Sequence, residues 1–204
     1  MREFLYYSRS APTSGNFGSD LMKAGRLDIA IHTVISSLFL SHSLRKNTRL
    51  HLIFAGAPDP QKHLEFEPVT EGKTGMDKIY LSKKDIAGLI KKMLYKYKEG
   101  KKNEVFPGYW IEKKGLLKVV EELSEKEKSI YILDPKGEDI REIGIGKNPV
   151  FVVGDHLGLP QKELKRLKKM GKLVSIGKRK YFASQTIAIV NNEIDRLEDS
   201  GLLE

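Results

Sequence analysis

The chain has 204 residues and a formal net charge of +9, and 40% of its residues are hydrophobic while 31% are charged. This length supports one substantial core, so we expect a single globular domain over residues 1–204. The absence of cysteine excludes disulfides, thiolate catalysis and cysteine-bound metals, and it is compatible with a cytoplasmic location. No membrane span is expected, because polar side chains interrupt the most apolar stretch, residues 27–44. We also expect no signal peptide, because Met1 leads almost directly into a strand-like segment.

The first part of the chain alternates between strand-like and helix-like patterns. Short apolar runs predict strands, and apolar residues at helical spacing predict a helix. Segments rich in Gly, Pro, Ser and Asn predict loops. The expected elements are a strand at 3–8, a loop at 10–20, a helix at 26–44, a strand at 50–54 that ends at Ala55–Pro60, and a loop or short hairpin at 61–77.

The second part continues this alternation. Ser82 followed by Asp85 is typical of a capping box at the start of a helix. The expected elements are a strand at 79–81, a helix from 82 to about 98, a helix at 115–123, a strand at 129–133 ended by Asp134-Pro135, a strand at 150–153, a basic helix from 161, a strand at 173–176 and a helix at 184–199. Strands that alternate with helices predict an α/β fold with a mostly parallel sheet.

Two of the expected strands are each followed by a glycine. Val150–Val153 leads into Gly154-Asp155-His156, and Leu173–Ile176 ends at Gly177. In open α/β sheets, ligands lie at the carboxyl ends of such strands, and a glycine there lets a ligand approach the backbone. Each glycine alone is more simply a turn residue, but two at matched strand ends favour a small-molecule site. No G-x-G-x-x-G motif is present, so a Rossmann-type nucleotide site is not expected.

Positive charge is concentrated in residues 161–180, where nine basic side chains accompany a single acid, Glu163. The basic residues are Lys162, Lys165, Arg166, Lys168, Lys169, Lys172, Lys178, Arg179 and Lys180. A one-sided basic stripe is typical of a surface that contacts nucleic-acid phosphates. The alternative is a lysine-rich surface that only faces solvent.

Several motifs carry a resemblance to a known family. The stretches V-V-G-D-H-L-G-L-P, V-S-I-G and A-S-Q-T-I-A resemble the cofactor-binding part of the SPOUT methyltransferases. The stretches F-L-Y-Y-S-R-S-A-P-T-S-G-N-F, G-R-L-D-I-A-I-H and L-I-F-A-G-A-P-D-P are similar to the tRNA (pseudouridine-54, N1)-methyltransferases. This resemblance covers nearly the whole chain. It implies methyl transfer from S-adenosyl-L-methionine to tRNA, a trefoil knot within about residues 129–204, and a homodimer.

The resemblance also implies where the cofactor and the RNA bind. In SPOUT enzymes, backbone groups of three loops hold the cofactor. The corresponding residues here are Leu133, Asp134, Gly154, Asp155, Ser175, Ile176, Gly177 and Ala183. The residues expected to contact RNA phosphates are Lys165, Arg166, Lys169, Lys178 and Arg179. Apolar residues of the last helix, Ile187, Ile189, Val190 and Ile194, are candidates for part of the dimer interface, or else they pack only on their own sheet.

Methylation of N1 of pseudouridine requires removal of the N1 proton, and a carboxylate that accepts this hydrogen bond would both orient and deprotonate the base. Asp59, within A-P-D-P after a strand, is the candidate base, although it is equally well explained as a turn residue before proline. Related rRNA pseudouridine N1-methyltransferases carry Arg-Pro-Asp at the comparable loop, where this chain has Ala57. The role of that arginine is then either absent or filled by another residue, for which Arg9 is one candidate.

The five histidines show neither i,i+4 spacing nor a carboxylate-paired motif, so no metal is expected. Two classes of function remain open. One is an enzyme that methylates tRNA pseudouridine, with N1-pseudouridine or ribose methylation of another RNA such as rRNA as the alternative. The other is a non-catalytic RNA-binding protein that retains a cofactor pocket.

Overall fold

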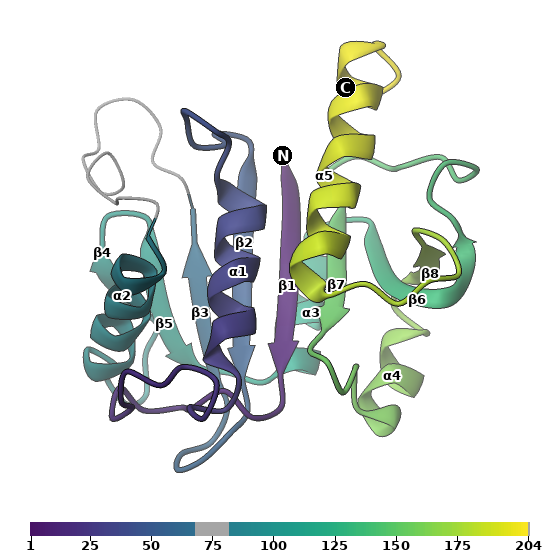
Figure 1. The fold of residues 1–204 in the computed structure, drawn as a ribbon. Helices are drawn as coiled ribbons and strands as arrows, with labels where there is room; N and C mark the ends of the chain where they lie inside the picture. The colour runs from purple at the N-terminus through teal and green to yellow at the C-terminus, as the bar shows by residue number, and fades with distance from the viewer. Residues whose placement is uncertain (68–81, 204) are drawn as a thin grey trace.

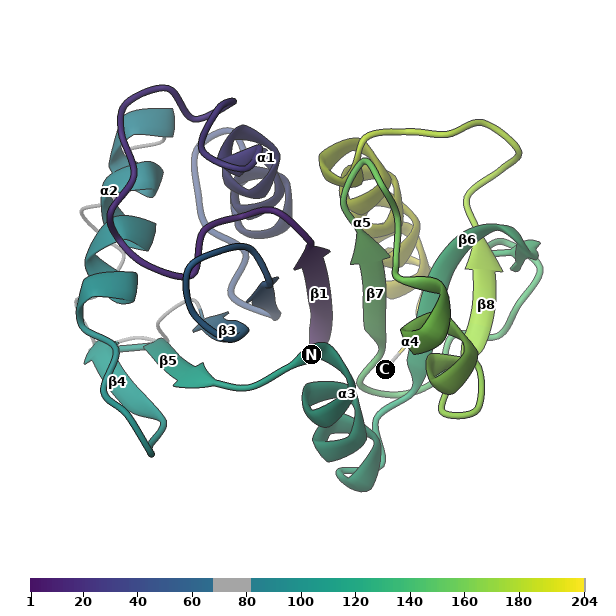
Figure 2. The ribbon, with the colours of Figure 1, turned by 90° about the horizontal axis from the view of Figure 1, so that it is seen from below.

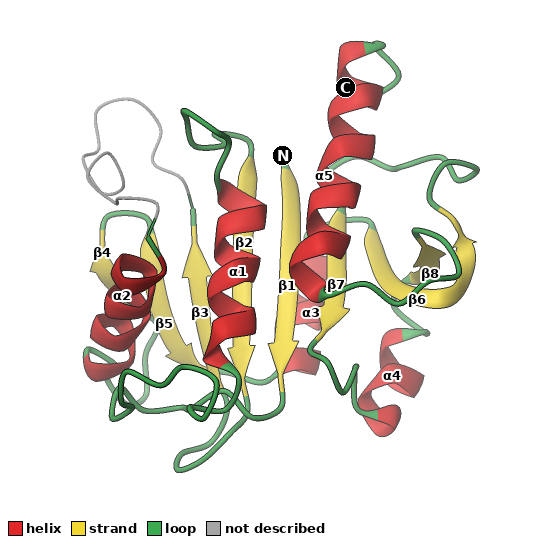
Figure 3. Cartoon of the chain, in the orientation of Figure 1, coloured by secondary structure: helices red, strands yellow, loops and turns green. Residues whose placement is uncertain are grey.

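The computed structural model describes residues 1–67 and 82–203, which form one mixed sheet with helices on both faces (Figures 1 and 3). The strands are β1 (Arg2–Ser8), β2 (Thr48–Phe54), β3 (Lys62–Phe66), β4 (Asn103–Phe106), β5 (Tyr109–Lys113), β6 (Ile130–Asp139), β7 (Val150–Gly154) and β8 (Lys172–Ser175). Their order across the sheet is β4-β5-β3-β2-β1-β7-β6-β8. Strands β2, β1, β7, β6 and β8 are mutually parallel, whereas β3, β5 and β4 pair antiparallel. The expected α/β fold with a mostly parallel sheet is therefore confirmed.

The helices lie in two layers. They are α1 (Leu27–Leu38), α2 (Lys83–Tyr95), α3 (Leu116–Glu125), α4 (Gln161–Leu167) and α5 (Ala183–Asp199). Helices α1, α2 and α5 cover one face of the sheet, and α3 and α4 lie on the opposite face (Figure 2). None of the helices that the structure describes is long and apolar enough to cross a lipid bilayer.

Strand β1 lies near the middle of the sheet, and all seven of its residues are buried. Successive side chains of a strand point to opposite faces. Phe4 and Tyr6 accordingly join the larger core beneath α1, α2 and α5, whereas Leu5 and Tyr7 join a smaller core beneath α3 and α4. This double burial explains why the segment contains almost no exposed polar position.

Two expected helices prove shorter than their patterns suggest. The helix predicted over 26–44 ends at Leu38, because Phe39 takes an extended conformation and forms a bridge with Leu44. Apolar residues beyond 38 belong to this turn. Their spacing in the sequence continues the apolar pattern of the helix, although the helix itself has ended. The helix predicted from Ser82 is confirmed, with the Ser82 hydroxyl accepting a hydrogen bond from the Asp85 backbone N–H, but it ends at Tyr95 rather than near 98.

Three strands depart from the prediction. The segment predicted as a loop or short hairpin over 61–77 contains one described strand, β3, which pairs antiparallel with β2, whereas residues 68–77 and the strand predicted at 79–81 lie outside the described residues. Strands β4 and β5 were not expected. The strand predicted to end at Asp134-Pro135 continues to Asp139, because β6 shifts its register on β8 between Leu133 and Glu138 and so accommodates the proline.

Helix α5 packs against the core of its own chain. Ile187, Val190 and Ile194 are completely buried, so these three residues pack on their own core and cannot form a dimer interface. The buried Arg2 guanidinium donates hydrogen bonds to the side chains of Asp195, at 2.7 Å, and Glu198, at 2.6 Å. The first strand is thereby tied to the last helix.

Candidate active site

The carboxyl ends of the parallel strands meet along one edge of the sheet, which is the lower edge in Figure 1 and faces the viewer in Figure 2. Strand β1 ends level with both neighbours, because Ser8 pairs with Phe54 of β2 and Tyr7 pairs with Gly154 of β7. Strand β6 lies on the side of β7 away from β1, and its Leu133 pairs with β8. The predicted cofactor loops and catalytic candidates follow strands that end along this edge.

Asp155 fixes the loop after β7 to the end of β1. Its Oδ2 accepts a hydrogen bond from the Arg9 backbone N–H at 2.8 Å, and its Oδ1 accepts one from the Leu157 N–H at 2.8 Å. The side chain is buried, and the Ser8 hydroxyl lies 3.5 Å from Oδ2. Both carboxylate oxygens are thus occupied within the protein, so this residue offers a ligand backbone groups only.

Gly154 is required by its own loop. A Cβ at this position would lie 2.5 Å from the carbonyl carbon of Gly158, because the loop folds back against the end of β7. Gly158 itself has a φ of 72°, with open space beside its Cα. The glycine that sequence reasoning assigned to cofactor contact is therefore explained first by the tight turn, and the open backbone lies at Gly158.

The loop after β8 has the open space that Gly154 lacks. Gly177 has a φ of 118°, and no atom lies within 4 Å of the place where its Cβ would be. The Ser175 hydroxyl accepts a hydrogen bond from the Gly177 N–H at 2.9 Å and donates to its carbonyl at 3.0 Å. The side chain of Ser175 therefore shapes the turn, and Ile176 and Gly177 present backbone groups.

The remaining cofactor candidates also act on local shape. Asp134 Oδ1 accepts a hydrogen bond from the Lys136 backbone N–H at 2.8 Å, which stabilises the turn where β6 changes register. Ala183 is buried at the start of α5. Gly137 went unnoticed in the sequence, although a Cβ there would collide with the backbone of Val174. Only its isolated position within a strand could have signalled this close approach.

Asp59 lies in a loop that is fixed by Thr13. The buried Thr13 hydroxyl accepts a hydrogen bond from the Asp59 backbone N–H at 2.8 Å and lies 3.1 Å from the carbonyl oxygens of Gly56 and Asp59. The Asp59 carboxylate is 49% exposed, and its nearest cation is Lys62 Nζ at 3.9 Å. A held backbone with a half-exposed carboxylate leaves Asp59 able to meet a substrate.

Arg9 is exposed beside the same edge, and its backbone N–H is bound to Asp155. The positive charge of its guanidinium interacts electrostatically with Glu163 of α4 rather than with Asp59. Burial raises the pKa of Glu163 in α4, and the positive charge of Arg9 only partly opposes this rise. Among the described residues, no hydrogen bond or ion pair connects Arg9 with Asp59.

The predicted RNA contacts are all exposed. Lys165 and Arg166 lie on α4, Lys169 follows it, and Lys178 and Arg179 lie in the loop before α5. No ion pair within the described residues involves any of the five. Two aromatic side chains, Tyr181 and Phe182, are also exposed directly after the second group. The surface therefore combines unpaired positive charge with rings on which a base can stack.

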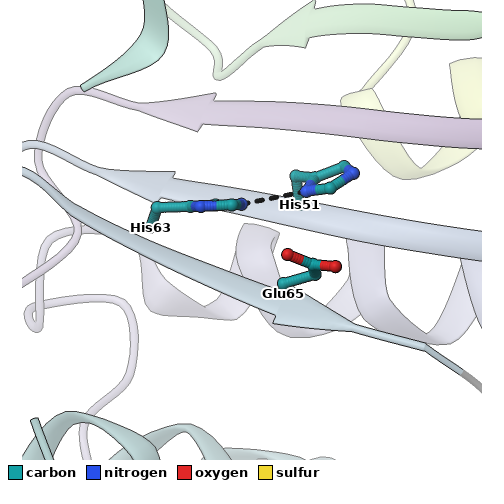
Figure 4. A group of neighbouring side chains, drawn as sticks. All are labelled: His51, His63 and Glu65. Atoms are coloured by element: carbon teal, nitrogen blue, oxygen red, sulfur yellow. Dashed lines mark hydrogen bonds between the residues drawn. The ribbon is translucent and has the colours of Figure 1, made fainter. Parts of the chain in front are cut away.

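A second group of ionisable residues lies away from this edge, beneath the half of the sheet formed by β1, β2, β3 and β5. His51 and His63 contact each other, with 2.9 Å between Nδ1 and Nε2, and Glu65 lies beside them (Figure 4). Sequence reasoning missed this group because its members are brought together by strand pairing rather than by spacing. The ligand atoms of the three residues lie within 4.8 Å of one another.

The comparisons with known proteins show the family of the chain. Residues 1–199 match the protein family described as “Putative SAM-dependent RNA methyltransferase”. The chain belongs to this family. A relative from Pyrococcus abyssi, named tRNA (pseudouridine(54)-N(1))-methyltransferase, is 36% identical over 202 residues, covering 97% of this chain and 98% of its own. A relative of the same name from Methanococcoides burtonii is 34% identical over 200 residues, covering 96% of each chain.

A solved structure supports the same fold for this RNA methyltransferase. The crystal structure of Archaeoglobus fulgidus Nep1 bound to S-adenosylhomocysteine aligns with a TM-score of 0.65 at 15% identity, covering 97% of this chain and 99% of Nep1. This likeness extends over the α/β sheet and its helices. The trefoil knot, which the SPOUT resemblance implies for the C-terminal part, remains a prediction.

Proposed function

We propose that this RNA methyltransferase transfers a methyl group from S-adenosylmethionine to N1 of pseudouridine 54 in tRNA. The observation that carries the proposal is similarity over almost the entire chain to relatives with this activity in their names, at 36% and 34% identity. Such coverage includes both the loops after β6, β7 and β8 and the loop that holds Asp59.

The loops fit a cofactor that is recognised by backbone groups. Gly177 and Gly158 leave open space beside their Cα atoms, and the side chains of Asp155 and Ser175 are already used to shape the turns. The backbone at 133–134, 154–158 and 175–177, together with Ala183, would hold S-adenosylmethionine. This cofactor supplies an electrophilic methyl group to the site.

The protein's own residues would then prepare the base. The Asp59 carboxylate accepts the hydrogen bond from N1–H and takes this proton as N1 gains its methyl group, which leaves Asp59 protonated until water removes the proton. Its loop is held by Thr13, so the backbone that carries the carboxylate is fixed before the RNA arrives. Arg9 would favour the developing negative charge on the base electrostatically, from the exposed side of the same edge.

The surface around α4 would hold the tRNA. Lys165, Arg166 and Lys169 would contact phosphates, and Lys178 and Arg179 would do so beside the exposed Tyr181. We further propose that the enzyme acts in the cytoplasm and as a homodimer. The interface would not use Ile187, Val190 or Ile194, which are buried within one subunit. Equilibrium sedimentation that finds a fully active monomer would contradict the dimer.

Labelled S-adenosylmethionine tests the proposed activity. Label should transfer to tRNA that carries pseudouridine at position 54 and not to the same tRNA with uridine there. Transfer to an rRNA fragment in preference to tRNA would indicate the alternative substrate, and transfer to both tRNAs would indicate ribose methylation. Cofactor binding without transfer to any RNA would indicate a non-catalytic RNA-binding protein.

A further inference from the structure

Four buried side chains form a continuous row across β1, β2, β3 and β5. Glu3 Oε2 lies 2.9 Å from His51 Nε2, His51 Nδ1 lies 2.9 Å from His63 Nε2, and His63 Nδ1 lies 3.0 Å from Glu112 Oε1. Strand register creates the row, because His63 is paired with Glu112 across β3 and β5. Each histidine therefore has a carboxylate on its outer nitrogen and the other histidine on its inner nitrogen.

Each end of this row is a carboxylate that is also paired with a lysine. Glu3 forms an ion pair with Lys128, and Glu112 forms one with Lys114 at 2.8 Å. The outer nitrogens, His51 Nε2 and His63 Nδ1, therefore face carboxylates that can accept their hydrogen bonds.

The two inner nitrogens, His51 Nδ1 and His63 Nε2, lie 2.9 Å apart. A neutral imidazole has one N–H, so when both outer nitrogens donate to carboxylates the inner nitrogens carry lone pairs that face each other. A cation between them, either a shared proton or a metal ion, satisfies both lone pairs.

Glu65 provides a third ligand, a carboxylate oxygen, at the same place. It is paired directly with His51 across β2 and β3, and its side chain lies beside both rings (Figure 4). A cavity of about 50 Å³ adjoins the group and is lined by His51, His63 and Glu65 among others. A water molecule occupies about 30 Å³ in the liquid, so the cavity has room for one further small ligand.

We propose that His51 Nδ1, His63 Nε2 and the Glu65 carboxylate bind a divalent transition metal ion, with zinc as the best match to two imidazoles and one carboxylate. Water from the cavity would complete a tetrahedral set. Zinc–nitrogen bonds of about 2.0–2.1 Å place tetrahedral nitrogens roughly 3.3 Å apart, so the two rings need to separate by only a few tenths of an ångström.

The surroundings match those of metal-bound histidines. Such histidines commonly donate their other N–H to a carboxylate, which fixes the ring and raises its basicity, and Glu3 and Glu112 occupy these positions. The described ion pairs around the site contain more carboxylates than cations. The carboxylates are Glu3, Glu65, Glu67, Glu112 and Glu122, and the cations are Arg49, Lys102, Lys114 and Lys128.

One cation competes directly with the metal. Lys102 forms an ion pair with Glu65 Oε2, and its side chain is 41% exposed, so it can leave for solvent when the metal binds. Arg49 Nε is farther away, 3.6 Å from Glu65 Oε1. The site lies on the α3 side of the sheet and joins β2 to β3, away from the cofactor loops. Its metal would stabilise the fold without entering the methyl transfer, and this proposal is independent of the proposed function.

Metal binding by the intact protein tests the proposal directly. Chelator-treated protein would be titrated with Zn²⁺ by calorimetry and with Co²⁺ by visible absorption, which reports tetrahedral coordination. We expect one ion per chain and a Tm that rises with Zn²⁺, because a ligand that binds only the folded state stabilises it. Wild-type protein that binds neither ion stoichiometrically would overturn the proposal and leave a shared proton as the bridge.

Three variants locate the site. His63→Asn should abolish stoichiometric binding, and Glu112→Gln should weaken it by about 10–100-fold. His42→Asn removes an exposed histidine that is not part of the row and should bind as wild type does. Unchanged affinity in His63→Asn, or equal loss in His42→Asn, would show that the metal binds elsewhere.

Lys102→Gln gives a test that misfolding cannot imitate. Removal of the competing cation should increase zinc affinity, whereas Lys101→Gln, an exposed neighbour with the same charge change, should leave it unchanged. Equal affinity in Lys102→Gln and wild type would contradict a role for Glu65 as a ligand.

Discussion

The two halves of the sheet organise polar groups in opposite ways. In the half formed by β1, β7, β6 and β8, the strands are apolar and parallel, and polar side chains such as Asp155 and Ser175 shape the loops. In the half formed by β2, β3, β5 and β4, antiparallel pairs bring ionisable side chains such as His51 and His63 together beneath the sheet. In the first half, backbone groups are available to contact a ligand, whereas in the second half ionisable side chains are available.

This difference predicts how each half responds to mutation. A site made of backbone groups tolerates changes of side chain but not changes of backbone shape. A site made of side chains loses its chemistry when one functional group is replaced, while its shape persists. Asp59 follows β2 and belongs to the second kind, whereas Gly177 follows β8 and belongs to the first.

The largest expected effect is on turnover in Asp59→Asn. The change keeps the shape and removes the proton acceptor, so kcat should fall by about 10²–10⁴-fold. Binding of cofactor and tRNA should stay near wild type, because the loss arises mainly in the transition state. Asp199→Asn makes the same chemical change at an exposed site and should be fully active. A fall of less than about threefold, far below the general-base range, would reduce Asp59 to a turn residue.

The basic surface should control tRNA binding and its dependence on salt. Replacement of Lys165, Arg166 and Lys169 by Gln should flatten the slope of log K against log [salt] by roughly 2–3 units, because three phosphate contacts are lost. Cofactor affinity should not change. A matched triple replacement of exposed lysines on and after α2, at Lys84, Lys92 and Lys96, should keep the wild-type slope. Equal slopes in both triple variants would assign α4 to solvent.

Backbone shape in the proposed cofactor loop after β8 is tested by Gly177→Val. A branched residue disfavours a φ of 118° and fills the open space beside the backbone, so calorimetry should show weaker S-adenosylmethionine binding. Gly100→Val imposes comparable strain, at a φ of 76° with open space around it, but lies away from the loops. Normal cofactor binding by folded Gly177→Val would remove this loop from the site. Gly154→Val is a poorer test, because its side chain would strike Gly158.

The smallest expected effect concerns stability at low pH. Burial opposes the ionisation of Asp195, but Arg45 and Arg2 outweigh it and hold its pKa below the usual 3.8. A lowered carboxylate pKa contributes stability above the unfolded value, and this contribution is lost as pH falls below it. Asp195→Asn should therefore cost about 1–3 kcal/mol at neutral pH and less at pH 3, as measured by urea unfolding. A cost that does not change with pH would contradict this account of how Arg2 holds α5.

The parallel half was largely predictable from the sequence, and the antiparallel half was not. Apolar runs such as Val150–Val153 identify buried strands without knowledge of their partners. Asn103–Phe106 is short, polar and only partly buried, so β4 has no such signature. The metal candidates escaped notice for a related reason. His51 and His63 are twelve residues apart, and only the register of β2 on β3 brings their rings together.

Asp59 shows a different limit. Its position after a strand was visible in the sequence, but the contact that holds its loop was not, because Thr13 lies 46 residues away. The same is true of Gly154, whose need for a small residue comes from the backbone of Gly158. Sequence patterns thus identified the strand ends that share one edge of the sheet, where the proposed site lies, while the reasons for individual residues depended on contacts between loops.

The most direct test of the account is the identity of the modified nucleoside. After incubation of wild-type enzyme and S-adenosylmethionine with tRNA that carries pseudouridine at position 54, the RNA would be digested and its nucleosides separated and weighed by mass spectrometry. The account predicts N1-methylpseudouridine derived from position 54, in an amount that depends on Asp59. A methyl group on a ribose, on another nucleoside, or on no nucleoside at all would contradict it.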